Sequence, residues 1–150
     1  MVSPAHRSYS GLLCFAIEQA LADARRSKRS FPEQCLQHAA GAKGAERLAL
    51  LSPAKPGSTA QQLSYATMEK SVRALATSLA SQLVHQGETV VLAMPNSIEL
   101  CVSLLAVPLL GACAFPMSVS LKDDETSLLL SLSAATLILV KDGPSAPRCP

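Results

Sequence analysis

The clearest pattern of hydrophobic and polar positions lies between residues 65 and 83. Apolar side chains recur there three or four positions apart, as on one face of a helix, and they are Tyr65, Met68, Val72, Leu75, Ala76, Leu79 and Leu83. Lys70 and Arg73 fall on the opposite face. Ser64 is placed to cap the first turn, and Gly87 is placed to end the helix. The segment is therefore predicted to be an amphipathic helix that covers a core.

Four other segments have the length and pattern of β-strands. Leu48–Leu51 and Gln61–Ser64 flank a turn rich in Pro and Gly at residues 53–58, which predicts a hairpin. Thr89–Met94 and Leu137–Val140 are continuous apolar runs. Such runs are typical of strands that are buried on both faces of a parallel sheet.

The region between these two apolar runs predicts another helix and another strand. Residues from Ile98 to about Leu110 are apolar all round the helix, so we expect that helix to be buried. The Asn-Ser pair at 96–97 can cap its start, and Gly111 is placed to end it. Ala112–Phe115 then reads as a strand, which Pro116 is predicted to terminate.

One further helix completes the series of elements. Asp123 is placed to cap a helix that reaches about Ser133. The predicted order is β, β, α, β, α, β, α, β, with short connections. This alternation predicts the α/β class, with strands and helices joined by right-handed crossovers.

Composition divides the chain into three sections. Residues 1–33 carry an excess of basic side chains and a predicted helix from Leu12 to Lys28, and we expect them to form a basic helical extension. Residues 34–142 hold the alternating elements, and the stretch Gly41–Ala45 near their start resembles a linker. Residues 143–150 read as a Pro-rich tail or a truncation.

Overall composition excludes some classes of protein. Apolar residues make up 49% of the chain and charged residues 16%, which is too hydrophobic for a disordered chain. A net charge of +2 and an aromatic content of 3% do not favour nucleic-acid binding. The cysteines are odd in number and form no C-x-x-C pair, which predicts reduced thiols, with Cys101 and Cys113 as small core residues. We expect an intracellular, cytoplasmic protein, with mitochondrial and peroxisomal locations left open.

A membrane hairpin is an alternative interpretation of the apolar regions. The chain is uncharged from Leu100 to Leu121, which meets the length of a membrane-spanning helix. Pro108, Gly111 and Pro116 interrupt this run, and a proline inside a helix costs about 3 kcal/mol or more. Two buried strand-and-helix units explain the pattern better, so no membrane span is expected.

Four motifs then follow one another in a fixed order. They are Leu63-Ser64-Tyr65, Met94-Pro95-Asn96-Ser97-Ile98-Glu99, the Leu-Leu-Ala and Gly-Ala-x-x-x-Pro pattern within Leu104–Pro116, and the helix-then-strand ending within Asp124–Val140. In this order and with these gaps they resemble the adenylate-forming superfamily, which includes acyl-CoA synthetases, luciferase-like enzymes and the adenylation domains of peptide synthetases. The resemblance covers roughly residues 34–142. The chain departs from the family pattern at Gln86-Gly87-Glu88, which is shorter and keeps one glycine, and at Leu109, where a basic residue is common.

The resemblance implies a fold and a reaction. The chain would form part of the N-terminal α/β domain of an adenylate-forming enzyme, incomplete by itself. Enzymes of this kind use ATP and Mg²⁺ to join a small carboxylic acid to AMP, and then pass the acyl group to a thiol, with CoA as the expected acceptor. The implied partner of this chain is the remainder of its parent domain.

The family's phosphate-binding loop, a Ser/Thr/Gly-rich stretch that ends in Pro-Lys, has no counterpart here. Lys55–Thr59 has similar letters but falls in the predicted hairpin turn. The acidic residues at 123–125 are explained by a helix start rather than a metal site. Ser97 lies outside a G-x-S-x-G motif, and Glu99 has no His partner that would make it a general base. We therefore assign no catalytic, cofactor-binding or metal-binding residue to this chain.

These observations predict the N-terminal scaffold of an acyl-CoA synthetase-like ligase that is inactive alone. The alternative from another class is a non-enzymatic, truncated binding or decoy module. The membrane hairpin is a lesser alternative.

Overall fold

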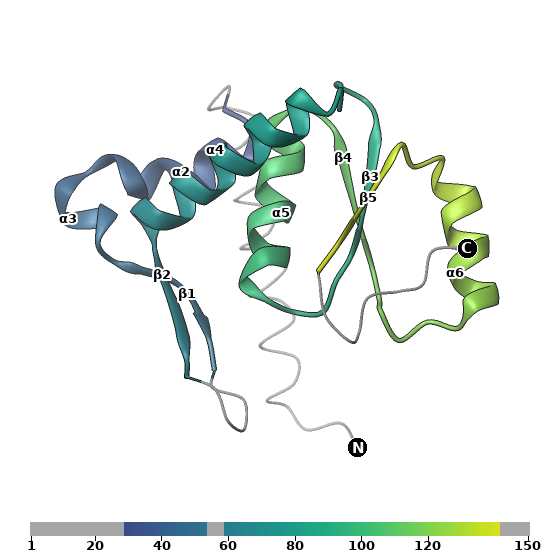
Figure 1. Ribbon diagram of the computed structural model, residues 1–150. Helices are drawn as coiled ribbons and strands as arrows, with labels where there is room; N and C mark the ends of the chain where they lie inside the picture. The colour runs from purple at the N-terminus through teal and green to yellow at the C-terminus, as the bar shows by residue number, and fades with distance from the viewer. Residues whose placement is uncertain (1–28, 54–58, 142–150) are drawn as a thin grey trace, which may run out of the picture.

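The computed structural model describes residues 29–53 and 59–141. A three-stranded parallel sheet forms the centre of this region (Figure 1). Two long helices lie on one face of the sheet and a third lies on the other face. A separate two-stranded hairpin stands beside the long helices. The architecture is therefore α/β, as the alternating pattern predicts.

Three short helices come first: α2 (Phe31–Leu36), the 3-10 helix η1 (Gln37–Ala40) and α3 (Ala42–Ala45). Ser30 caps α2, because its side-chain oxygen accepts from the Glu33 N–H at 3.5 Å. In return, the Ser30 N–H donates to Glu33 Oε2 at 2.7 Å. This hydrogen bond is the main cause of the lowered pKa of Glu33. The linker interpretation of residues 41–45 is wrong, since they form a single helical turn that closes on the Gly41 carbonyl. The predicted helix Leu12–Lys28 lies outside the described residues.

The hairpin is confirmed. Strand β1 (Leu48–Ser52) pairs antiparallel with β2 (Gln61–Ser64), with an irregularity between Leu48 and Leu50. The chain passes directly from β2 into the first long helix, and the Tyr65 N–H donates to the Arg47 carbonyl at 3.0 Å.

Helix α4 (Tyr65–Ser81) follows the predicted stripe closely, with one exception at its end. Met68, Val72, Ala76 and Leu79 are buried, and Ser64 accepts a hydrogen bond from the Thr67 N–H as predicted. Leu83 is instead 71% exposed and adopts a positive φ of 63°. This left-handed residue turns the chain, so that Val84 enters the core in its place.

The prediction that Gly87 ends α4 is wrong. The helix has already ended at Ser81, and Gly87 lies in the turn before the central strand with a φ of 86°. Its N–H donates to the Gly111 carbonyl at 3.0 Å. Gly87 therefore uses the backbone freedom of glycine in the turn before β3, which is hydrogen-bonded to the turn at Gly111, and not to cap α4.

Helix α5 (Ile98–Leu109) begins and ends at the expected residues. Ser97 caps it by accepting a hydrogen bond from Leu100, and Gly111 follows it with a φ of 75°. The prediction of complete burial is only partly right, because buried positions occupy one side of the helix: Val102, Ser103, Ala106 and Val107. Pro108 lies in the last turn.

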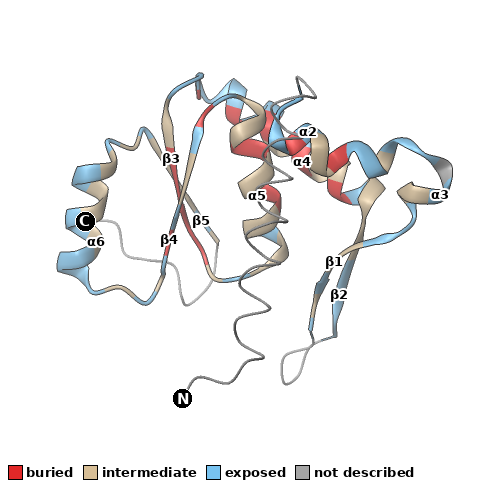
Figure 2. Ribbon diagram, turned by 180° about the vertical axis from the view of Figure 1, so that it is seen from behind, coloured by how far each residue is buried: buried red, intermediate tan, exposed pale blue. Residues whose placement is uncertain are grey.

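Strand β3 (Thr89–Ala93) is the centre of the sheet, between β4 (Cys113–Met117) and β5 (Leu137–Val140), and both neighbours are parallel to it. Residues 90–93 of this strand are at most 1% exposed, and Figure 2 shows the buried part of β3 in red. The expectation that β5 is buried on both faces is wrong. It is an edge strand, its side chains are half-buried, and Val140 is 44% exposed.

Strand β4 corrects two further predictions. Pro116 does not terminate the strand but lies within it. The Cys113 N–H donates to the Glu88 carbonyl at 2.7 Å, so alternation turns the backbone of Pro116 away from β3, where its missing N–H is tolerated. Cys113 is exposed rather than a core residue, and Cys101 is half-buried.

Helix α6 (Asp123–Ser133) has the predicted range but a different cap. Lys122, not Asp123, occupies the N-cap, and its N–H donates to Glu125 Oε2 at 3.1 Å. Glu125 in the first turn therefore makes the capping contact that the sequence predicts for Asp123. The helix packs on the sheet through half-buried leucines and has no buried residue. Across residues 29–53 and 59–141, helices with the length and apolar character needed to span a bilayer do not occur.

Candidate functional site

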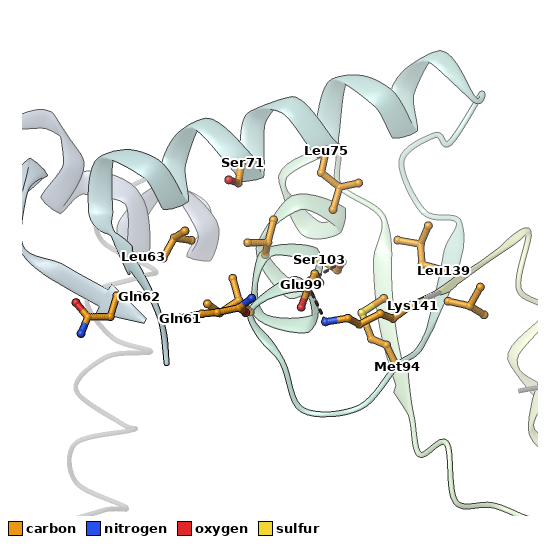
Figure 3. A pocket seen from close by; sticks show the side chains of 13 residues that line it. Gln61, Gln62, Leu63, Ser71, Leu75, Met94, Glu99, Ser103, Leu139 and Lys141 are labelled. Carbon is orange, nitrogen blue, oxygen red and sulfur yellow. Dashed lines mark hydrogen bonds and ion pairs between the residues drawn. The ribbon is translucent and has the colours of Figure 1, made fainter. Parts of the chain in front are cut away.

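A groove of about 660 Å³ lies on the α5 side of the sheet (Figure 3). The hairpin strand β2, helices α4 and α5 and strand β5 form its walls. The lining residues are Gln61, Gln62, Leu63, Ser71, Leu75, Met94, Ile98, Glu99, Val102, Ser103, Leu139, Val140 and Lys141. A cavity of this size falls in the range of small-molecule sites.

Most of the groove surface is apolar, and its buried polar group is already satisfied. Leu75 and Val102 come from the two long helices and Leu139 from β5. Ser103 is 3% exposed, and its hydroxyl donates to the Glu99 carbonyl at 2.8 Å. Because this hydrogen bond lies within α5, the hydroxyl does not point to a ligand or a reacting atom.

An ion pair closes one end of the groove. Lys141 Nζ donates to Glu99 Oε1 at 2.7 Å, which joins the end of β5 to the first turn of α5 (Figure 3). The hydrogen bond from Lys141 is the main cause that lowers the pKa of Glu99, and the α5 backbone adds to it. The Lys141 and Glu99 side chains are 37% and 50% exposed, so water screens the pair.

We predict that Lys141→Met lowers stability by about 0.2–1 kcal/mol at neutral pH, the range of exposed ion pairs. A lowered carboxyl pKa stabilises the fold above the unfolded-state pKa, and this stabilisation is lost as pH falls through the folded-state pKa. The difference between the variant and the original chain should therefore shrink as the pH falls from neutral through the folded-state pKa of Glu99. Urea unfolding at neutral and at acidic pH measures this difference in stability. An equal difference at both pH values would contradict the ion-pair interpretation.

The structure places the residues considered from sequence as follows. Ser97 caps α5, and its side chain accepts from the Leu100 N–H at 3.3 Å. Glu99 is bound to Lys141. The acidic residues at 123–125 form the exposed first turn of α6, and Lys55–Ser58 lie outside the described residues. Within residues 29–53 and 59–141, no three His, Cys, Asp or Glu side chains come together in a group that could hold a metal ion.

Sequence reasoning missed the groove and the Glu99–Lys141 pair. The two residues are 42 positions apart and lie on different elements. Only the packing of β5 beside α5 brings them together, so no local motif could have indicated the contact.

The parallel sheet with helices on both faces defines the described residues as a segment of a layered α/β domain. Residues 36–149 match the family model described as AMP-binding enzyme. The chain therefore belongs to the AMP-binding enzyme family, as its motifs indicate.

Curated relatives agree with this assignment. The long-chain-fatty-acid–CoA ligase FadD13 of Mycobacterium tuberculosis is 34% identical over 90 residues, which are 60% of this chain and 18% of that protein. A linear gramicidin synthase of Brevibacillus parabrevis is 30% identical over 130 residues, 84% of this chain and 2% of that protein. The 4-coumarate–CoA ligase 4 of Arabidopsis thaliana is 32% identical over 85 residues, 57% of this chain and 15% of that protein.

Solved structures show the same fold. The N-terminal domain of FACL13 from Mycobacterium tuberculosis, bound to an inhibitor, aligns with a TM-score of 0.64 at 27% identity and covers 73% of this chain and 26% of that one. IdnL1 aligns with a TM-score of 0.69 at 22% identity, over 80% and 23% of the two chains. The chain thus spans less than a third of the relatives and structures that it matches here.

Proposed function

We propose that this chain is the N-terminal scaffold of an ATP-dependent carboxylate-activating ligase, inactive without the rest of its domain. The carrying observation is the family match over residues 36–149, together with a sheet and helices that account for about a quarter of the solved homologous chains. The full reaction would form an acyl-AMP and then a thioester. In this proposal the scaffold supplies folded layers, and other segments supply the reacting groups.

The chemistry of the described residues supports a scaffold role. A reaction centre needs polar groups that point at a common reacting atom. In the groove, Glu99 and Lys141 bind one another, and the Ser103 hydroxyl binds its own helix. Of the residues that sequence analysis considered, Ser97 caps α5 and Glu99 binds Lys141, which supports this role.

The proposed cofactors and substrate follow from relatives. O-succinylbenzoate coenzyme A synthetase (MenE) of Bacillus subtilis, solved with ATP and magnesium ion, aligns with a TM-score of 0.62 at 24% identity over 72% of this chain and 27% of that one. Two curated relatives are named as CoA ligases. We therefore propose ATP and Mg²⁺ for the whole enzyme, CoA as the thiol acceptor and a small carboxylic acid as substrate, with a role in fatty acid metabolism.

Two further features of the proposal concern location and domain division. Cys35, Cys101 and Cys113 are free thiols, which supports an intracellular protein. We propose the cytoplasm, with mitochondrial and peroxisomal locations left open. The division into residues 1–33, 34–142 and 143–150 stays a prediction. Helix α2 (Phe31–Leu36) runs across the first of these boundaries.

We predict that the purified chain does not catalyse carboxylate-dependent exchange of pyrophosphate into ATP. The reason is that the phosphate loop of the family has no counterpart in this sequence. FadD13, assayed in parallel with a long-chain fatty acid, is the positive control. Exchange above that of the heat-denatured chain would overturn the scaffold proposal and require a reaction centre in this chain.

The second candidate is a non-enzymatic binding or decoy module. The observation that favours it is the open apolar groove, which could hold another molecule. A stable monomer that binds a small apolar acid in the groove, and that gains nothing from the rest of the domain, would support this candidate instead.

A further inference from the structure

The outer side of helix α6 carries a row of exposed side chains that changes from acidic to apolar along the helix. Leu128 is 58% exposed and Leu132 is 72% exposed. Asp124 is also exposed and lies four residues before Leu128. Residues four apart lie on one side of a helix, so these three form a single row. We call it the α6 stripe, and Figure 2 shows this side of α6 in pale blue.

The described part of the chain does not use the α6 stripe. Helix α6 packs on the sheet through Leu129 and Leu130, which lie on its other side. Within residues 29–53 and 59–141, no lysine or arginine forms an ion pair with the acidic residues at 123–125. Exposed leucines beside unpaired carboxylates fit a partner helix that carries apolar and basic side chains in the same order.

The chain itself contains a segment with this pattern before the described residues. Leu12–Lys28, which the sequence predicts to be a helix, carries Ile17, Leu21 and Arg25 at intervals of four. We propose that this segment of a second copy of the chain binds the α6 stripe, antiparallel to α6. The inference goes beyond the proposed function, because it assigns a partner to a surface that the ligase reaction does not involve.

The antiparallel orientation brings all three positions of each row together. The facing pairs are Arg25 with Asp124, Leu21 with Leu128, and Ile17 with Leu132. Each row covers eight residue steps, which is about 12 Å at 1.5 Å per residue, so the pairs form in one register. In the parallel orientation Arg25 would lie against Leu132, and the acidic end of the stripe would face an isoleucine. Charge therefore selects the antiparallel arrangement.

The position of α2 makes a second copy the source of this segment. Leu36 of α2 packs in a cluster with α4 and α5, which lie on the face of the sheet opposite α6 (Figure 1). The four residue steps from Arg25 to Arg29, the first described residue, span at most about 14 Å. The α5 layer alone is about 10 Å thick, and the sheet and α6 lie beyond it. The segment of the same chain is therefore too short to reach the stripe in this register.

Sedimentation of the 150-residue chain at several concentrations measures the proposed self-association. Asp124→Arg and Arg25→Asp should each weaken it about fivefold, which corresponds to about 1 kcal/mol for an exposed ion pair. A chain with both changes should associate as tightly as the original, because the pair is restored with the charges exchanged. Glu46→Arg changes the net charge equally at an exposed site outside α6, and it should leave the association unchanged.

A second pair of variants tests the apolar part of the stripe. Leu132→Asp should weaken the association at least about tenfold, since the leucine is covered only in the complex. Leu51→Asp is the matched control, because Leu51 is 57% exposed on β1, away from α6. Circular dichroism should show that both variants keep the fold.

Each outcome supports the proposal or overturns it. Recovery of association in the double charge reversal supports it, and no recovery overturns it. A chain that stays monomeric at every concentration, or equal weakening by Leu132→Asp and Leu51→Asp, also overturns it. Protection of the α6 amides that depends on Arg25 but not on protein concentration overturns the second copy, because the segment would then bind within its own chain.

Discussion

Replacing Val72 by Asp is expected to unfold this protein. Val72 is fully buried in a cluster that joins three helices, with Leu36 of α2, Met68 of α4 and Ala106 of α5. A carboxylate there would have no described basic side chain in the cluster to pair with. An uncompensated buried charge costs about 3–5 kcal/mol, a large part of the roughly 5–15 kcal/mol that stabilises a typical domain.

The measurement is circular dichroism during urea unfolding, with Ala74→Asp as the matched control. Ala74 is exposed on the same helix, so the same new side chain stays in water there. We expect the control to lose no more than about 1 kcal/mol, mainly through the lower helix propensity of Asp. Similar losses in both variants would show that the buried face of α4 has been assigned incorrectly.

The helical phase of α4 could be predicted because it depends on local periodicity. Four residues of the stripe are buried, from Met68 to Leu79. Leu83 breaks the pattern for a reason that periodicity cannot report. Its left-handed backbone ends the helix, and such a conformation in a leucine is imposed by tertiary structure rather than preferred by the residue.

The sequence contains a local signal for the start of α2. Ser30 and Glu33 form a capping box around Pro32, and the pattern Ser-x-x-Glu with an early proline is typical of a helix start. The basic composition of residues 1–33 predicts one continuous extension and does not separate this helix from the residues before it.

Sheet position could not be predicted from the same information. Thr89–Ala93 and Leu137–Val140 are both apolar runs, yet the first is the buried centre of the sheet and the second is an edge. The order of parallel strands in a sheet depends on how the crossovers pack. The hydrophobic pattern of a single strand does not contain this information. The edge position of β5 in turn creates the groove and brings Lys141 to Glu99.

The 150-residue chain is expected to bind a hydrophobic dye while it is folded. Large apolar side chains are exposed on several elements, including Leu132 at 72% on α6, Leu51 at 57% on β1 and Val140 at 44% on β5. The groove adds an apolar concavity beside that open strand edge. Soluble monomers rarely leave apolar patches of this kind uncovered unless another surface binds there. Dye fluorescence at sub-micromolar protein, below the onset of self-association, measures the exposed surface.

Two glutamate variants locate the part of the dye signal that comes from the groove. Ser71→Glu should lower the fluorescence because it places a charge among the groove residues, while Thr77→Glu should retain it. Joining the chain to the rest of a homologous domain should reduce the signal further, since the same surface is then covered. A cooperative thermal transition of a monomer that binds no dye would contradict this expectation. It would mean that the apolar side chains of β5 and the groove are covered within the chain itself, as a self-sufficient binding module requires.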